Sequence, residues 1–274
     1  MELKYLGTAA AEGIPGIFCE CIVCREAMKR GGKDVRTRSQ ALVDKQLLID
    51  FPPDSYWHMV RDGVSLPDLQ HVLITHTHTD HFYPDELYYR RKGFCITNRL
   101  MTFYGNDALK RRMDRYVQEE TGSSYPESRL ACEELAAFIS RDIGGFTVIA
   151  LPALHDRREN CFIYMIGRNG KWLLYGNDTG VFPESTWHFI RNHPFDLISL
   201  DCTTGKKAEG SNHMGVPDLI GIKQRLTENG CTHDKTVFVA THFSHNGGLL
   251  HDELEALLNP HGYLVAYDGL AVLV

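Results

Sequence analysis

The sequence predicts an α/β fold built from two sheets that are covered by helices. Short runs rich in Val, Ile, Leu and aromatic residues recur along the 274 residues and end at Gly, Asp, Asn or Pro, as strands do. Helical stretches are fewer and lie between groups of strands, so the order differs from the regular alternation of a βαβ array. No repeat, low-complexity tract or Pro/Ser-rich linker divides the chain, which predicts one domain over residues 1–274.

The predicted strands share their β-branched and aromatic composition. They are Leu3–Leu6, Ala41–Val43, Leu47–Ile49, Val72–Thr75, Phe146–Leu151, Cys161–Ile166, Trp172–Tyr175, Leu197–Leu200, Val237–Ala240, Tyr263–Ala266 and Ala271–Val274. The predicted helices share an apolar spacing of three and four residues. They are Asp107–Glu120, Glu133–Arg141, Pro183–Asn192, Val216–Glu228 and His251–Leu258. Pro183 at one start and Gly230 after one end are typical of helix termini.

Composition excludes several classes of protein. Hydrophobic residues at 43% and aromatic residues at 10% predict a packed core and exclude a disordered or fibrous chain. No apolar run approaches the ~18 residues of a membrane-spanning helix, and Met1–Lys4 lack the apolar stretch of a signal peptide. Eight Cys in a chain long enough to bury its own core indicate reduced thiols, some of them metal-binding, in a cytoplasmic protein.

One segment, residues 88–115, differs from the rest of the chain in charge. It holds eight basic and two acidic residues, a local charge of +6 in a chain whose formal net charge is −6. One interpretation is a solvated helix face, and the other is a positive flank that attracts a phosphorylated substrate.

The run Thr75-His76-Thr77-His78-Thr79-Asp80-His81 predicts a metal site. It follows an apolar strand, and residues two apart in an extended chain point the same way, so His76 and His78 can share one ion. Asp80 and His81 come after the bend and can face a second ion. Imidazole and carboxylate ligands suit Zn²⁺, Mn²⁺ or Fe²⁺ alike.

Further ligand-type residues stand at the ends of later predicted strands. His155 follows Phe146–Leu151, Asp178 follows Trp172–Tyr175, and His242 follows Val237–Ala240. Each alone would more often be a surface residue, but loops at successive strand ends are where a sheet collects a functional site.

A second signature is Cys19-Glu-Cys21-Ile-Val-Cys24, in the loop after the first predicted strand. Three thiolates so close together repel one another unless a bound cation neutralises their charge, and Zn²⁺ is the cation best suited to thiolate ligands. The fourth ligand is expected to be a His from elsewhere in the chain. The other five Cys stand alone in apolar or loop contexts, which indicates ordinary core residues.

The His-x-His-x-Asp-His run, followed in order by His155, Asp178 and His242, is similar to the metallo-β-lactamase superfamily over essentially the whole chain. The resemblance implies an αββα four-layer sandwich with the site at one edge of the two sheets. It also implies the following ligands: His76, His78 and His155 for the first metal, Asp80, His81 and His242 for the second, Asp178 bridging both, and Asp50 orienting the cluster from outside it. Class B β-lactamases do not use such a bridging aspartate.

Within the superfamily, the cysteine loop, Thr241–His245 and the segments Leu200–Thr203 and Ser211–Gly215 resemble the phosphoribosyl cyclic phosphate phosphodiesterases of the carbon–phosphorus lyase pathway. This likeness implies that His245 completes a Cys₃His zinc site and that His213 contacts the substrate as general acid. The pyrroloquinoline quinone biosynthesis protein of the superfamily has a similar cysteine loop. Residues 82–141 are longer than in compact members, which predicts a lid or insertion near the active site.

The predicted function is hydrolysis of a small cyclic or nucleotide-like phosphodiester by a hydroxide shared between two metals, with Asp80, Asp178 and His213 as catalytic residues. The predicted cofactors are two divalent ions, Mn²⁺, Zn²⁺ or Fe²⁺, and one structural Zn²⁺. The predicted partner is a small phosphorylated substrate, with no membrane; family relatives suggest a homodimer, although no apolar stripe in the sequence decides it.

Four alternatives stay open: a tRNA-processing nuclease, a thioester hydrolase, a pyrroloquinoline quinone biosynthesis-type protein, and a zinc-organised binding protein that is not an enzyme. A nuclease should bind with an affinity that falls steeply with salt, and the net charge of −6 leans against a nucleic acid partner.

Overall fold

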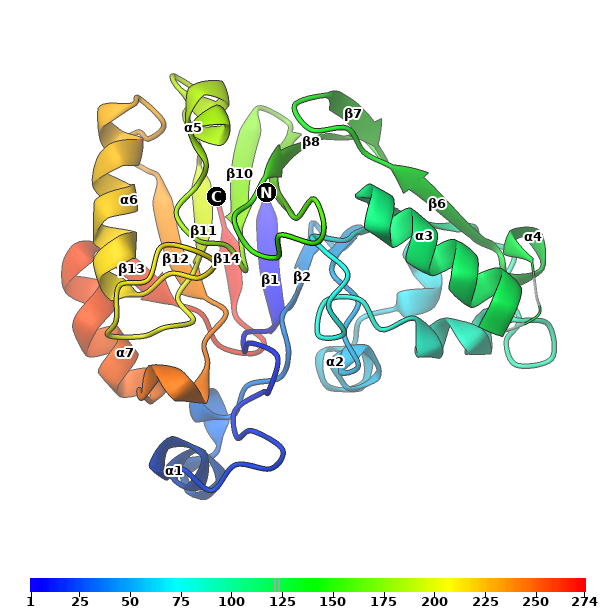
Figure 1. Cartoon of the computed structure of the whole chain (residues 1–274), viewed down its shortest axis with the longest axis horizontal. Coiled ribbons are helices and arrows are strands. Elements are labelled where there is room, and N and C mark those ends of the chain that lie inside the picture. The colour runs from blue at the N-terminus through cyan, green and yellow to red at the C-terminus, as the bar shows by residue number, and fades with distance from the viewer. Residues whose placement is uncertain (121, 123) are drawn as a thin grey trace.

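The computed structural model describes residues 1–120, 122 and 124–274. Within them, two seven-stranded sheets pack face to face, and helices cover the outer face of each sheet (Figure 1). This arrangement confirms the predicted α/β four-layer fold. None of the helices formed by these residues is long and apolar enough to span a membrane.

The first sheet has the strand order β14-β1-β2-β3-β4-β5-β6. Its strands are β1 (Glu2–Gly7), β2 (Gln40–Val43), β3 (Leu47–Ile49), β4 (His71–Leu73), β5 (Met101–Gly105), β6 (Leu130–Glu134) and β14 (Ala271–Leu273). The strands from β3 to β6 run parallel, so their carboxyl ends meet at one edge.

The second sheet has the order β13-β12-β11-β10-β9-β8-β7. Its strands are β7 (Ser140–Ile143), β8 (Phe146–Pro152), β9 (Phe162–Arg168), β10 (Lys171–Gly176), β11 (Leu197–Asp201), β12 (Val237–Thr241) and β13 (Tyr263–Val265). Strands β10 to β13 are parallel, and β7 to β10 pair antiparallel.

Seven α-helices lie within the described residues. They are α1 (Ile22–Arg30), α2 (Ser55–Asp62), α3 (Asp107–Arg115), α4 (Tyr125–Ser128), α5 (Glu184–Ile190), α6 (Val216–Glu228) and α7 (His251–Leu258). A π-helical turn, Tyr116–Glu120, continues α3, and a 3₁₀ stretch, Pro84–Arg90, follows the histidine-rich loop.

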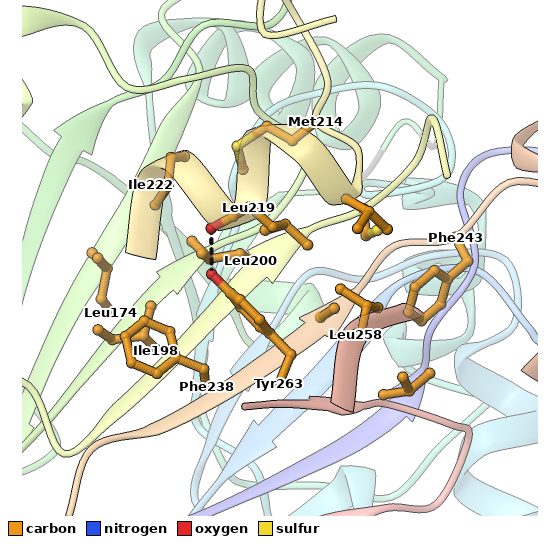
Figure 2. Close-up of a cluster of buried hydrophobic side chains, with 14 of the residues drawn as sticks. Leu174, Ile198, Leu200, Met214, Leu219, Ile222, Phe238, Phe243, Leu258 and Tyr263 are labelled. Carbon is orange, nitrogen blue, oxygen red and sulfur yellow. Dashed lines mark hydrogen bonds between the residues drawn. The ribbon is translucent and has the colours of Figure 1, made fainter. Parts of the chain in front are cut away.

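The core has one layer between the sheets and one under each helical cover. Between the sheets, Leu3 and Phe146 pack with the fully buried Tyr164 and Tyr175. Figure 2 shows the cover of the second sheet, where Leu219 of α6 and other apolar side chains of α6 and α7 lie against the strands. The Tyr263 hydroxyl donates to the Leu219 carbonyl at 2.7 Å, which satisfies the one polar atom of that ring inside the core.

All of the predicted strands are present, with ends that differ by one or two residues. Helices α6 and α7 begin and end at the predicted residues, α5 lies inside Pro183–Asn192, and α3 with its π-helical turn spans Asp107–Glu120. Three strands (β5, β6 and β7) and three helices (α1, α2 and α4) were not predicted.

The predicted helix Glu133–Arg141 is wrong. Its two ends belong to β6 and β7, which pair with β5 and β8 at the edges of different sheets. The apolar run Leu135–Phe138 has a spacing that a helix would also produce. The conformation is determined instead by two sheet edges, whose unpaired backbone groups bind the two ends of this segment. No local sequence pattern reveals such edges.

The predicted lid or insertion at residues 82–141 stays a prediction. Part of this segment, β5 and β6, extends the first sheet, and α3 packs on the outer face of that sheet through Leu109 and Met113.

Candidate metal centre

The candidate site lies where strands of both sheets end. The histidine-rich loop follows β4, and His155, Asp178 and His242 follow β8, β10 and β12. Backbone φ is +49° at Asp178 and +61° at His242, and it is +64° at Asp50, which follows β3. A non-glycine residue in this left-handed region ends the extended path of the strand. The conformation is energetically unfavourable, and such residues are found mainly at functional sites, where they orient a side chain.

The predicted first-metal residues converge. His78 Nδ1 lies 3.1 Å from His155 Nε2, and His76 Nε2 lies 3.3 Å from Asp178 Oδ2. One ligand atom from each of these four residues falls within 4.8 Å of all the others.

The predicted second-metal residues converge beside them. His81 Nε2 lies 3.2 Å from Asp80 Oδ2, 3.3 Å from His242 Nε2 and 3.0 Å from Asp178 Oδ2. Asp178 therefore belongs to both groups, the position that the sequence predicted for a bridging carboxylate.

These distances fit the geometry of metal coordination. Ligand atoms about 2.0–2.1 Å from one ion, at angles between right and tetrahedral, lie about 2.9–3.4 Å apart. The buried His76 Nε2 and Asp178 Oδ1 also lack a hydrogen-bond partner among the described residues. Because an orphaned buried polar atom is costly, two such atoms facing one cluster fit a bound cation.

The outer nitrogens of the imidazoles are held by oxygen atoms. His81 Nδ1 donates to Asp50 Oδ2 at 2.7 Å, so the structure brings Asp50 to the place predicted for it. His78 Nε2 donates to Asp156 Oδ2 at 2.9 Å, and His242 Nδ1 lies 3.2 Å from Asp201 Oδ2. Such partners fix the tautomer and ring orientation of a ligand histidine, so that its other nitrogen faces the ion.

Burial and charge set the protonation of these groups. Burial lowers the pKa of His76 and of His155, which keeps both rings neutral and able to bind a cation. Burial alone would raise the pKa of Asp178, but the neighbouring His242, His213 and His81 hold that pKa well below its usual range. Asp178 is therefore an ionised carboxylate, as its predicted bridging role requires.

The cysteine loop forms a separate cluster with His245. His245 Nδ1 lies 3.6 Å from both Cys19 Sγ and Cys21 Sγ, and Cys24 lies within the same 4.8 Å group. Tetrahedral zinc with S at ~2.3 Å and N at ~2.0–2.1 Å separates those two ligand types by about 3.6 Å. Burial raises the pKa of Cys21, but hydrogen bonds from Cys24 and Cys19 outweigh it and lower that pKa to about 6. A thiolate beside two more thiols fits a zinc ion.

A cavity of about 560 Å³ opens over the paired cluster. Its wall includes Asp178 and the ring of His213, whose Nδ1 lies 3.1 Å from Asp178 Oδ1 and 3.4 Å from Asp201 Oδ2. His213 keeps 22% of its side-chain surface, whereas Asp178 and Asp201 are almost fully buried. The ring therefore lines the cavity beside the cluster, where it can reach a small molecule bound there.

The basic segment 88–115 is spread over several surfaces. Lys110 pairs with Asp114, and Arg111 pairs with Asp107, each one turn apart on α3, as the solvated-face interpretation predicts. Arg112 lines a separate hollow beside His78 and Asp80, and it donates to the Thr77 carbonyl.

Three functional carboxylates were missed from the sequence. Asp201 ends β11, within the Leu200–Thr203 segment that carried the resemblance, so its strand-end position was a usable signal. Asp156 directly follows His155 and had no separate signal. Glu159 accepts from the Thr77 backbone N–H and hydroxyl at 3.0–3.1 Å and so clamps the histidine-rich loop.

Residues 46–249 match the family model described as a beta-lactamase superfamily domain. The chain belongs to this superfamily. Its members are metal-dependent hydrolases, and the His and Asp clusters of this chain could bind such metals. The match agrees with the observed four-layer fold.

Solved structures with the superfamily fold cover nearly the whole chain. A diphosphatase from the PhnP family has a TM-score of 0.75 and 21% identity over 99% of this chain and 96% of its own. Zn²⁺-bound PqqB from Methylobacterium extorquens has a TM-score of 0.78 and 21% identity over 100% of both chains. The short form of human tRNase Z has a TM-score of 0.67 and 17% identity over 100% of this chain and 99% of its own. These likenesses show the fold.

One relative is similar in sequence as well. An octanoyltransferase from Porphyromonas gingivalis is 36% identical over 281 residues, which include all of this chain. The chain spans 52% of that relative's length, about half of it.

Proposed function

We propose that this chain is a metal-dependent phosphodiesterase that hydrolyses a small cyclic or nucleotide-like phosphodiester, as the phosphoribosyl cyclic phosphate phosphodiesterases do. The observation that carries the proposal is the pair of ligand clusters that share Asp178 under a cavity lined by His213. The fold shared with a PhnP-family diphosphatase supports it.

In this proposal the chain holds two ions through seven side chains. His76, His78 and His155 bind the first, Asp80, His81 and His242 bind the second, and Asp178 binds both. Two divalent ions held there would lower the pKa of a bound water and would offset the charge on phosphoryl oxygens. Mn²⁺, Zn²⁺ and Fe²⁺ all accept this ligand set.

His213 moves the proton of the reaction. Its ring lines the cavity, and Asp201 lies behind it, so the ring is oriented toward the substrate. As general acid it protonates the departing alkoxide, a contribution of roughly 10²–10⁴ in rate. Opening a cyclic diester in this way leaves a phosphomonoester.

Cys19, Cys21, Cys24 and His245 hold a structural zinc in this proposal. His245 lies three residues after His242, so a closed zinc site would tie the cysteine loop to the strand end that supplies a catalytic ligand. Such a site contributes to folding, and it offers no open position for chemistry.

A second candidate is hydrolysis of an acyl thioester or ester at the same centre. The 36% identity with a protein named octanoyltransferase favours it. The same two metal ions could polarise a carbonyl oxygen instead of a phosphoryl oxygen.

The test uses protein loaded with Mn²⁺ or Zn²⁺, its metal content verified by elemental analysis. Bis-p-nitrophenyl phosphate, ribose cyclic phosphate and p-nitrophenyl octanoate are offered in parallel, with Asp178→Ala as the inactive control. Turnover of a diester that is absent in the control supports the proposal. Turnover of the octanoyl ester alone replaces it with the second candidate, and one zinc per chain with no turnover indicates a binding protein.

A further inference from the structure

A groove of about 660 Å³ lies beside the metal centre. One wall is the connection from β6 to β7, with Leu135, Ala136 and Ala137. The other is the end of β8 and the loop after it (Figure 1), including Leu154. His155 lines both this groove and the cavity over the metal cluster, so the two hollows adjoin at a predicted metal ligand.

The groove combines small apolar walls with a polar rim. Ala136, Ala137 and Ala153 form small apolar parts of the walls beside the larger Leu154 and Phe162. Asn160 and Ser211 stand exposed at the edge, where charged side chains such as Glu134 also line the groove. A site of this size and kind takes a small molecule whose faces are apolar and whose edge makes hydrogen bonds. A nucleobase has these properties, because its ring faces are apolar and its edge carries donors and acceptors that can bond to the groups of the rim, whereas an alkyl chain offers them no hydrogen bond.

The groove is also fixed to the catalytic loop. Glu159 in its wall accepts hydrogen bonds from Thr77 and from Asn106, and Asn106 caps α3. A group bound in the groove is therefore positioned against the same rigid frame as the predicted ligands His76 and His78.

The position of His213 indicates which part of the substrate reaches the groove. Ser211 lines the groove, and Asn212 and His213 line the metal cavity, so residues 211–213 lie between the two. In the proposed function His213 protonates the departing alkoxide. The substituent of that leaving group then extends toward Ser211 and the groove.

We propose that this groove binds the nucleobase of the leaving group, so that the preferred substrate is a nucleoside-bearing phosphodiester and not a bare sugar phosphate. The inference rests on the proposed function for the reaction, but base binding can be measured without turnover.

The test fills the groove with Ala136→Trp and compares it with Ala256→Trp, an equal change at an exposed position on α7, on the far side of the molecule (Figure 1). Adenosine binding to the metal-loaded protein is measured by calorimetry. KM and kcat are measured for 2′,3′-cyclic AMP and for ribose cyclic phosphate. We expect Ala136→Trp to weaken adenosine binding and to raise KM for the cyclic nucleotide by about tenfold or more, with both constants for ribose cyclic phosphate unchanged.

The outcomes separate the two proposals. Weaker adenosine binding in Ala136→Trp alone supports the groove even if no diester is hydrolysed, and that lack of hydrolysis overturns only the proposed function. Equal adenosine binding in both variants, or an equal loss of activity toward both substrates, overturns the assignment of the groove to a nucleobase. Leu154→Glu, a change of a side chain that is 40% exposed on the opposite wall, repeats the test if Ala136→Trp does not fold.

Discussion

Removal of the Asp156 carboxylate should weaken the first metal site specifically. Asp156 Oδ2 accepts from His78 Nε2 at 2.9 Å, and hydrogen bonds from Arg158 hold the pKa of Asp156 well below its usual range, so an anion orients this imidazole. Loss of such a partner typically costs 10–100-fold in metal affinity, or about 1.4–2.7 kcal/mol. We expect Asp156→Ala to show a loss in this range and Asp156→Asn a smaller one, because the amide oxygen still accepts the hydrogen bond.

Stepwise metal affinities, measured by competition with a chromophoric chelator, check this prediction. The second site should change little, because the outer nitrogens of His81 and His242 are held by Asp50 and Asp201 instead. Asp252→Asn is the matched control, since Asp252 also pairs with an arginine, Arg30 at 3.1 Å, on another part of the surface. If Asp156→Ala binds both ions as tightly as the parent protein, the reasoning about the His78 contact is refuted.

Four other changes test the site and its frame. His213→Gln should lower turnover by roughly 10²–10⁴ with the metal content unchanged, and loss of an ion on elemental analysis would instead make His213 a ligand. Cys21→Ser should remove one zinc per chain and lower the melting temperature, and unchanged zinc would contradict the Cys₃His site. Gly180→Ala should cost about 1–3 kcal/mol in denaturant unfolding, because the added Cβ meets the Gly210 carbonyl at 2.4 Å. Gly221→Ala, with nothing within 4 Å in the middle of α6, should instead gain about 0.5–1 kcal/mol.

Local patterns were sufficient for much of the fold. Strands such as Leu197–Leu200 and helices such as Val216–Glu228 can be recognised in the sequence, because the apolar residues that each element buries follow the pattern typical of a strand or of a helix. The pattern failed at Glu133–Arg141, where pairing with two separate sheet edges outweighed a helical spacing. It also missed α1 and α2, which are short and carry exposed apolar residues such as Ile22 and Trp57.

By itself the sequence determined the kinds of groups in the site. The spacing of His76, His78, Asp80 and His81 reflects local backbone geometry, and the Cys19–Cys24 loop concentrates thiols whatever the rest of the chain does. The family resemblance implied the roles of Asp178 and His245, but only the tertiary structure brings Asp178 between both clusters and His245 to cysteines more than 220 residues away. That Asp156 and Asp201 hold two of the imidazoles was found from the tertiary structure alone. Those contacts depend on which strand ends the two sheets bring together. The packing of the sheets is determined by burial over the whole core, so it cannot be predicted from any single segment of the sequence.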